Sequence, residues 1–387
     1  MPKVDNLSLI SVLRHTLTVA MIGINVSTAT INVNQVSFKP NTYNVGNGSS
    51  YLFGSSVSGA NSIEISSLTI IIGNSSNFML LGSMVTTSSN RYLFGGITAY
   101  INTASSINVN SVILDSYQKF STGYVQSSGF LVGYVDSSSI NVTLKNLCLQ
   151  QNMTTTTLEF LRFGLIGESS GNTSIQNASV TFSVPDTWFN CFGIVGRQNS
   201  NSFAEVINLR TSVSINSSNG DNVGSVFGYE GAKNCSVKNT NVVGGNISGS
   251  NYVGGIIGDQ YNNMTIMNSS VLSSNLSGLS QIGGIIGDSN PNANATILDY
   301  LVQNSNFSGS YQVGGIIGYC YSSKLYLTNV QIKFVRITSS SDSGVVVGKN
   351  NGGTYSFITS TASSNYINSV KQTDCVSLSN SKPLTGC

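Results

Sequence analysis

Two aspartates occupy the same place in two copies of a repeated motif. Asp259 follows Val-Gly-Gly-Ile-Ile-Gly, and Asp288 follows Ile-Gly-Gly-Ile-Ile-Gly in the next copy. If the copies stack, one carboxylate lies directly above the other. Two carboxylates that share a site raise the pKa of one of them, recruit a cation, or act together as general acid and base. These two residues are therefore the candidates for catalysis or cation binding.

The neighbouring copies limit that chemistry. The position after the final glycine of each copy holds, in order, Tyr134, Glu168, Arg197, Tyr229, Asp259, Asp288, Tyr319 and Lys349. Tyrosines flank the two aspartates, so the convergent polar groups of a lyase or hydrolase site are missing. We expect the two acids to lie apart in a solvated turn, and we assign no catalytic, cofactor-binding or metal-binding residue. Glu168 beside Arg197 is predicted to form an exposed pair worth ~0–1 kcal/mol.

Three asparagines share another register. Asn246, Asn275 and Asn306 each begin an Asn-x-Ser sequence. Stacked inward at a corner, they would form an amide hydrogen-bond ladder. Pointing outward, they would be acceptors for glycans. We favour the ladder and leave glycosylation open.

Repeated strands must position these residues. The final glycines of the clear copies recur at nearly constant intervals and stand at Gly167, Gly196, Gly228, Gly258, Gly287, Gly318 and Gly348. Fainter copies end at Gly133, Gly95 and Gly54. Short alternating runs between Gly, Asn and Ser clusters indicate strands and turns. Because three strands of ~5–6 residues and their corners fill one coil, the sequence predicts an all-β, right-handed parallel β-helix (a β-solenoid) of about ten coils of roughly 30 residues.

The ends of the chain depart from this pattern. We expect an N-terminal cap or irregular segment at residues 1–40, a solenoid repeat domain at residues 41–360 and a polar C-terminal tail at residues 361–387. Within the first segment, a capping helix and a strand fit equally well the stripe formed by Leu7, Ile10, Leu13, Leu17 and Met21.

The glycine motif contains two adjacent apolar residues. Strand side chains alternate between faces, so Ile256 and Ile257 cannot both point inward on a regular strand. A bulge at the glycines would turn both inward. Otherwise one row forms an exposed aliphatic stripe, which predicts self-association. We slightly favour the bulge.

The repeat resembles a known family. The order of Val-Gly-Gly-Ile-Ile-Gly, a turn, Thr-Ile-x-Asn-Ser-Ser and Asn-x-Ser-Gly is similar to the GLUG-type repeat of microbial surface proteins, most clearly over residues 220–350. The resemblance implies a β-solenoid stalk on a secreted or cell-surface protein, often an adhesin, and brings no catalytic residue. Asn and Ser often replace the glycine that the family has in the turn after the motif.

Composition excludes several classes of function. Only 8% of the residues are charged, the net charge is +2, and the 17 Lys and Arg are scattered, so no nucleic-acid footprint exists. The sequence contains no stretch of 18 apolar residues, so it predicts no transmembrane helix. Arg14 and His15 interrupt the apolar run that a secretory signal needs. The chain is thus a fragment, carries an atypical signal, or is intracellular.

The cysteines do not form a motif. Four cysteines occupy different registers of the repeat: Cys148, Cys191, Cys235 and Cys320. We therefore expect them to be small residues of the core and not to form a disulfide ladder. Cys375 and Cys387 could bridge in an oxidising compartment. The only histidine, His15, lies outside the repeats, and Trp188 is expected in a loop between coils.

These observations favour a non-enzymatic, adhesin-like β-solenoid, extracellular or on the cell surface, without a cofactor. Its expected partner is a glycan or a host or cell-surface protein. The alternatives are a carbohydrate-active β-helix enzyme that uses Asp259 and Asp288, and an intracellular interaction scaffold.

Overall fold

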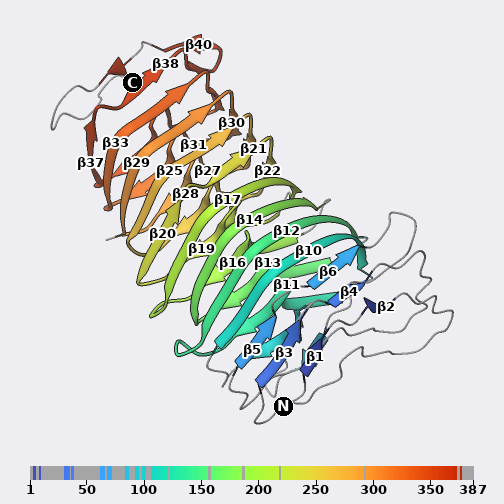
Figure 1. The fold of residues 1–387 in the computed structure, drawn as a ribbon. Helices are drawn as coiled ribbons and strands as arrows, with labels where there is room; N and C mark the ends of the chain where they lie inside the picture. Colours follow the sequence, from blue (N-terminus) through green and yellow to red (C-terminus); the bar gives the residue numbers. More distant parts are fainter. Residues whose placement is uncertain are drawn as a thin grey trace.

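The chain folds into a rod of stacked coils (Figure 1). The computed structural model describes residues 106–120, 123–155, 158–184, 188–217, 219–291 and 293–372, short strands before residue 102, and the strand Cys375–Val376. This part of the chain is all-β, with 72% strand and no helix, and its parallel coils form a β-solenoid of about seven turns. The predicted fold class is confirmed, and the count of about seven turns is lower than the ten coils expected.

Two sheets run along the rod. The strands of the first sheet within the regular coils are β10 (Ser106–Phe120), β12 (Asn141–Thr155), β14 (Asn172–Val184), β17 (Phe203–Asn216), β20 (Asn234–Lys238), β21 (Asn241–Val243), β22 (Asn246–Ser248), β25 (Met264–Leu272), β26 (Asn275–Ser277), β29 (Asn294–Gln303), β30 (Asn306–Gly309), β33 (Lys324–Lys333), β34 (Arg336–Ser339), β37 (Thr354–Ile358), β38 (Thr361–Ser363) and β39 (Tyr366–Ile367).

The strands of the second sheet carry the glycine motifs. They are β11 (Gly123–Val135), β13 (Leu158–Ser169), β15 (Trp188–Phe192), β16 (Val195–Gln198), β18 (Val223–Gly224), β19 (Phe227–Glu230), β23 (Asn251–Gly254), β24 (Ile257–Gln260), β27 (Ser280–Gly283), β28 (Ile286–Ser289), β31 (Tyr311–Gly314), β32 (Ile317–Tyr321), β35 (Ser343–Gly344) and β36 (Val347–Asn351).

Within the regular coils, the strands pair in parallel with the equivalent strands of the next coil. Ile257 pairs with Ile286, and Ile286 pairs with Ile317, so one coil advances the register by one repeat. The coil cannot bury its apolar face alone, whereas the stack shares one continuous core of Val, Ile, Leu and Phe. Alternation of buried and exposed residues, clear along β14, leaves polar side chains on the outer faces.

A bulge in the glycine motif resolves the puzzle of the adjacent isoleucines. Ile256 and Ile257 are both fully buried. The carbonyl oxygen of Ile285 accepts hydrogen bonds from the amides of both Ile256 (3.0 Å) and Ile257 (2.9 Å). Two residues of one coil thus face one of the next, and both side chains turn inward. The bulge is confirmed; the exposed aliphatic stripe is wrong, and the self-association predicted from it loses its basis.

Glycine is required where the bulge closes. A Cβ atom on Gly254 would lie 1.7 Å from the carbonyl oxygen of Ile257, and Gly283 faces Ile286 in the same way at 1.9 Å. No side chain fits in that space. The repeated glycines therefore set how tightly the chain folds back within each coil.

The ends of the stack contain further strands. In the first 101 residues these are β1 (Lys3–Asp5), β2 (Ser8–Leu9), β3 (Thr30–Asn34), β4 (Val36–Phe38), β5 (Ser62–Ile65), β6 (Leu68–Ile71), β7 (Ser83–Thr86), β8 (Tyr92–Gly95) and β9 (Thr98–Ile101). β1 pairs in parallel with β3, and β2 with β4, so strands of the expected cap join the stack. Apart from β2, the stripe from Leu7 to Met21 lies outside the described residues.

At the other end, the stack continues past the boundary expected at residue 360. β38 and β39 pair in parallel with β33 and β34. β40 (Val370–Lys371) and β41 (Cys375–Val376) then pair antiparallel with β39 and β38. This reversal covers part of the last coil's edge, as edge protection requires.

Candidate functional site

The row that follows the glycine motif lies on the second sheet, in the register expected from the sequence. Tyr229 pairs with Asp259, Asp259 with Asp288, and Asp288 with Tyr319, and the row extends to Tyr134 and Lys349 through the successive pairs of the other coils. The two candidate aspartates are therefore direct neighbours on adjacent strands, β24 and β28.

The surroundings of the aspartates differ from the solvated turn that we expected. Asp288 is only 8% exposed, and its Oδ1 is buried with no hydrogen-bond partner among the described residues. Asp259 accepts a hydrogen bond from Nδ2 of Asn290. Burial raises the pKa of both carboxyls to about 7, and the nearby Asp259 charge raises that of Asp288 further. The expectation of two acids splayed in a solvated turn is wrong, since both lie on strands, where Asp288 is buried and Asp259 is partly buried.

Aromatic and cationic side chains continue the row on one side of the aspartates. The guanidinium of Arg197 lies 4.7 Å from the centre of the Tyr229 ring, and its Nε donates to Oδ1 of Asn199 at 2.9 Å. Glu168, expected to pair with Arg197, instead forms an ion pair with Arg162 at 2.8 Å. Arg162 lies on the same strand as Glu168, so the predicted pairing is wrong although the predicted register is right.

A buried polar column lies at the ends of the strands β16, β19 and β24, directly after this row. Gln198, Glu230 and Gln260 are in register on successive coils and are fully buried. The amide of Ala232 donates to Oε1 of Glu230 at 2.7 Å, whereas Oε2 has no hydrogen-bond partner among the described residues. Burial raises the pKa of Glu230 to about 8. Glu230 is therefore largely protonated at neutral pH, a point that its sequence position alone did not indicate.

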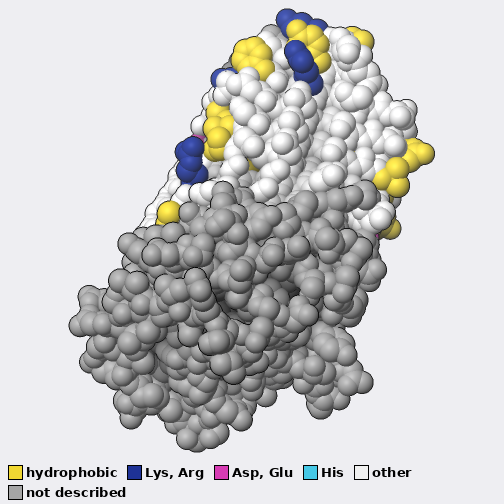
Figure 2. All heavy atoms as spheres, turned by 90° about the vertical axis from the view of Figure 1, so that its right-hand side faces the viewer, with side chains coloured by type: hydrophobic (Ala, Val, Ile, Leu, Met, Phe, Trp, Pro, Cys, Tyr) yellow, Lys and Arg dark blue, Asp and Glu magenta, His cyan; other side chains and the backbone are white. Residues whose placement is uncertain are grey.

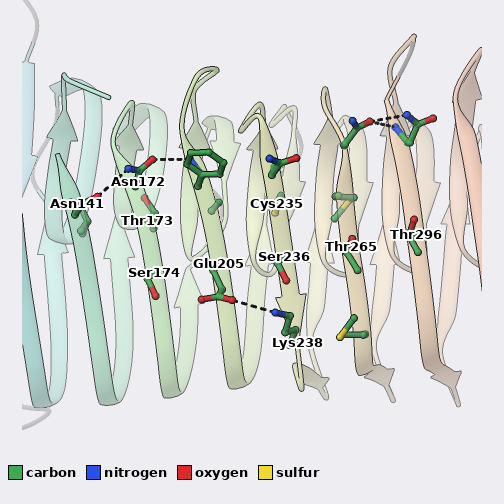
Figure 3. Close-up of a pocket in the computed structure, with 18 of the residues that line it drawn as sticks. Asn141, Asn172, Thr173, Ser174, Glu205, Cys235, Ser236, Lys238, Thr265 and Thr296 are labelled. Atoms are coloured by element: carbon green, nitrogen blue, oxygen red, sulfur yellow. Dashed lines mark hydrogen bonds and ion pairs between the residues drawn. The ribbon is translucent and has the colours of Figure 1, made fainter. Parts of the chain in front are cut away.

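A polar groove crosses the outer face of the first sheet (Figure 3). It runs over β12, β14, β17, β20, β25, β29 and β33. One row along it consists of asparagines, and the next of serines and threonines; the members are Asn141, Asn172, Asn234, Asn263 and Asn294, with Thr143, Ser174, Ser236, Thr265 and Thr296. Phe203 interrupts the asparagine row, Glu205 interrupts the row of serines and threonines, and Tyr326 ends it. The rings of Phe203 and Tyr326 are 52% and 45% exposed.

Hydrogen bonds between coils order the asparagine row of this groove. Nδ2 of Asn172 donates to Oδ1 of Asn141 at 3.0 Å, and Nδ2 of Asn294 donates to Oδ1 of Asn263 at 2.8 Å. Glu205, the one acidic residue among the described residues that line the groove, forms an ion pair with Lys238 at 3.3 Å. Lys324 is the further charged residue among the described residues of the lining, and amides and hydroxyls outnumber the charged groups.

The predicted asparagine ladder exists, but it faces outward. Nδ2 of Asn275 donates to Oδ1 of Asn246 at 2.7 Å, and Nδ2 of Asn306 donates to Oδ1 of Asn275 at 2.8 Å. All three side chains are exposed and lie on the first sheet, and two of them line a second, smaller groove. The inward orientation is wrong, because the small residue before each asparagine and the apolar residue after it take the inward places on these short strands.

A longer ladder escaped the sequence analysis. Asn146, Asn177, Asn208 and Asn239 have left-handed φ angles between 51° and 55°, and consecutive side chains are joined by hydrogen bonds of 2.8 to 3.2 Å. Asparagine tolerates this conformation better than most residues. The constant interval between these asparagines, equal to one repeat, is the signal in the sequence that could have revealed the corner.

Three of the four cysteines within the repeats are core residues, as predicted. Cys191, Cys235 and Cys320 are buried free thiols, and burial raises the pKa of Cys191 to about 12. Cys148 is exposed, so the core assignment is wrong for it. The backbone of Trp188 begins β15 instead of lying in a loop. His15 and Cys387 lie outside the described residues.

Comparisons with protein-family models, curated proteins and solved structures find no match to this chain. The resemblance to the GLUG-type repeat therefore stays a prediction. Within the described residues, no helix has the length and hydropathy needed to cross a membrane.

Proposed function

We propose that the chain is a non-enzymatic, adhesin-like β-solenoid of a cell surface or secreted protein, and that it binds a neutral glycan along the groove on the first sheet. The observation that carries the proposal is the groove itself, with parallel rows of amides and hydroxyls repeated coil after coil. The GLUG-like repeat supports the surface location.

The chemistry of the groove fits a sugar chain. Amides and hydroxyls both donate and accept, as sugar hydroxyls do. The exposed faces of Phe203 and Tyr326 offer apolar contact beside these polar groups. Because the rows recur at the strand spacing of ~4.8 Å, the surface presents a periodic set of partners to a periodic polymer.

The low charge of the surface points the same way. Figure 2 shows one side of the rod, where uncharged polar side chains and backbone cover most of the described surface and Lys and Arg occur only in small, separate groups. Only 8% of the chain is charged. A neutral ligand needs no counter-charge, whereas an anionic polymer would need a basic stripe.

The described residues of the groove do not include the pair of carboxyl groups that a glycosidase uses. Hydrolysis of a glycosidic bond commonly needs two carboxyl groups on either side of that bond. Glu205 is the one acid among the described residues of the groove lining and is engaged by Lys238, while Asp259 and Asp288 lie on the other sheet. These placements support binding without cleavage.

The test is binding of neutral oligosaccharides of increasing length, measured by calorimetry after a glycan-array screen. Phe203→Ala and Tyr326→Ala should each weaken binding roughly 3- to 10-fold, the worth of one aromatic contact. Tyr311→Ala is the matched control, because Tyr311 is 51% exposed but lies on the second sheet. Equal losses in all three variants, or no binding by the wild type, would reject the groove as a glycan site.

Two further measurements separate the alternatives. Wild-type protein should release no product from these glycans; product release that Asp259→Asn abolishes would favour the enzyme. Antibody staining of the source cells should be positive before permeabilisation. Staining only after permeabilisation would instead favour an intracellular scaffold.

A further inference from the structure

Among the described residues, Asp259 and Asp288 lack the cationic partner that several other acids of the solenoid have. Glu168 is paired with Arg162 at 2.8 Å, Glu205 with Lys238 at 3.3 Å and Asp342 with Lys349 at 3.1 Å. Asp259 instead accepts a hydrogen bond from the neutral amide of Asn290.

The second acid accepts a hydrogen bond from the backbone amide of Ser289, yet one of its two oxygens is unsatisfied among the described residues. Oδ1 of Asp288 is buried and has no hydrogen-bond partner within the described part of the chain, on a residue that is only 8% exposed. An unpartnered buried carboxylate oxygen is costly, so a group that supplies positive charge would stabilise this position.

The register of the two aspartates would allow one ion to bridge their carboxyls. Asp259 and Asp288 are register partners on adjacent parallel strands, which lie ~4.8 Å apart. Calcium binds oxygen at 2.3–2.6 Å, so an ion between two oxygens one strand apart makes a bond of ordinary length to each. Tyr229 and Tyr319 occupy the same row on either side of the pair.

The donor set selects the class of ion. The pair offers carboxylate oxygens only, and the part of the chain that the structure describes gathers no group of three or more His, Cys, Asp or Glu side chains. Zinc and other ions that favour nitrogen or sulfur are disfavoured. Calcium accepts variable geometry and completes its shell with water, whereas magnesium demands a near-octahedral shell.

We propose that Asp259 and Asp288 bind one Ca²⁺ ion between adjacent coils of the second sheet. With two protein carboxylates and the Arg197 guanidinium beyond Tyr229, the affinity is modest, with a Kd on the order of 10⁻⁴ to 10⁻³ M, as in extracellular calcium modules. The ion cross-links β24 and β28 and removes the repulsion between their acids.

Terbium luminescence tests the site directly, because Tb³⁺ takes the same oxygen ligands and is excited through nearby tyrosines. Excitation of the wild type should give Tb³⁺ emission that Ca²⁺ displaces. Asp259→Asn and Asp288→Asn should each weaken Tb³⁺ binding about tenfold or more, since each removes half of the charged ligands. Asp299→Asn, which alters an exposed acid on the first sheet that accepts from Asn329, should leave the emission unchanged.

A second measurement needs no variant. Saturating Ca²⁺ should raise the thermal unfolding midpoint of the wild type, because it binds only the folded stack, and this shift should be lost in Asp288→Asn. Circular dichroism confirms that the variants are folded. Absence of a Ca²⁺-dependent shift in the wild type, or emission that survives both substitutions, would overturn the proposal and leave the two carboxyls sharing a proton.

Discussion

Two columns of this solenoid each stack identical side chains, but one column satisfies its hydrogen-bonding groups and the other does not. The asparagines at 246, 275 and 306 join through hydrogen bonds of 2.7 and 2.8 Å in the open. The aspartates at 259 and 288 stack in the same way, but one leaves a buried oxygen without a partner among the described residues. An amide carries both a donor and an acceptor, so a copy of itself satisfies it; an ionised carboxylate only accepts.

The difference explains where each residue type is used. An amide column extends through any number of coils without adding charge, which suits the long polar faces of the first sheet. A carboxylate column needs a proton or a cation for every pair. Such a column is therefore an energetic cost unless something binds there.

Both columns depend on the stacking that the glycine rows set, so breaking the stacking has the largest effect. Gly254→Ala places a Cβ atom 1.7 Å from the carbonyl oxygen of Ile257. We expect a loss of more than about 4 kcal/mol in the free energy of unfolding, or failure to fold.

Gly244→Ala is the matched control for that change. Gly244 has a φ of 67°, but a Cβ atom there meets nothing within 4 Å. The substitution should cost only about 1–2 kcal/mol of left-handed strain. Equal losses in the two variants, measured by denaturant unfolding, would contradict a steric role for the motif.

The buried column sharpens the comparison by placing one carboxyl between two amides. Folding raises the pKa of Glu230 from 4.5 to about 8. The folded protein then binds a proton that the unfolded chain releases, so stability falls as pH rises from about 4.5 to about 8.

Glu230→Gln removes this titration while keeping the shape. Above pH 8 the free energy of unfolding of the variant should exceed that of the wild type by several kcal/mol, and below pH 5 the two should be closer. Unfolding by urea across this range measures both. Parallel pH profiles for the two proteins would show that Glu230 does not carry a proton in the core.

For the aspartate pair we also expect stability to fall as pH rises, but over a lower pH range than for Glu230. Burial raises the pKa of Asp259 and Asp288 from 3.8 to about 7. Without calcium, stability should therefore fall as pH rises from about 4 to about 7.

Asp288→Asn converts the pair into an amide beside a carboxylate, which resembles one step of the asparagine ladder. In the presence of a chelator we expect it to raise the free energy of unfolding above pH 7, by up to about 4 kcal/mol. Added Ca²⁺ should reduce this difference in the free energy of unfolding, because it should stabilise only the wild type. If the variant were less stable than the wild type in the presence of the chelator, the two carboxylates would not repel each other enough to destabilise the fold.

The reverse exchange should have the smallest effect. Asn275→Asp keeps the acceptor for Asn306 but loses the donor to Asn246. Because the site is exposed, we expect a loss of about 1 kcal/mol at neutral pH. Asn216→Asp is the control, since Asn216 faces Ser248 and not another asparagine. Equal shifts in the unfolding midpoint would mean that the ladder adds nothing.

Much of the fold could be predicted from the repeat. The spacing of the glycine motifs predicted the parallel stack, and it placed Asp259 beside Asp288 and Asn275 between Asn246 and Asn306. Register follows from a repeat because equivalent residues of successive coils must pair. The depth of a residue does not follow from it: the asparagines were expected inside and lie outside, whereas Asp288 was expected in water and is buried.

The sequence by itself determined the all-β stack and the one-coil register, because these follow from strand periodicity and from the nearly constant repeat interval. It left a bulge and an exposed aliphatic stripe as alternatives at the glycines, and the burial of both isoleucines in the structure decided for the bulge. Only the tertiary structure decided which face each row occupies, that Glu168 pairs with Arg162, and that Glu230 is enclosed. Those outcomes depend on how the corners turn and how two sheets close over one core. A repeat in the sequence determines which residues are neighbours on successive coils. Their exposure to water depends on the tertiary packing.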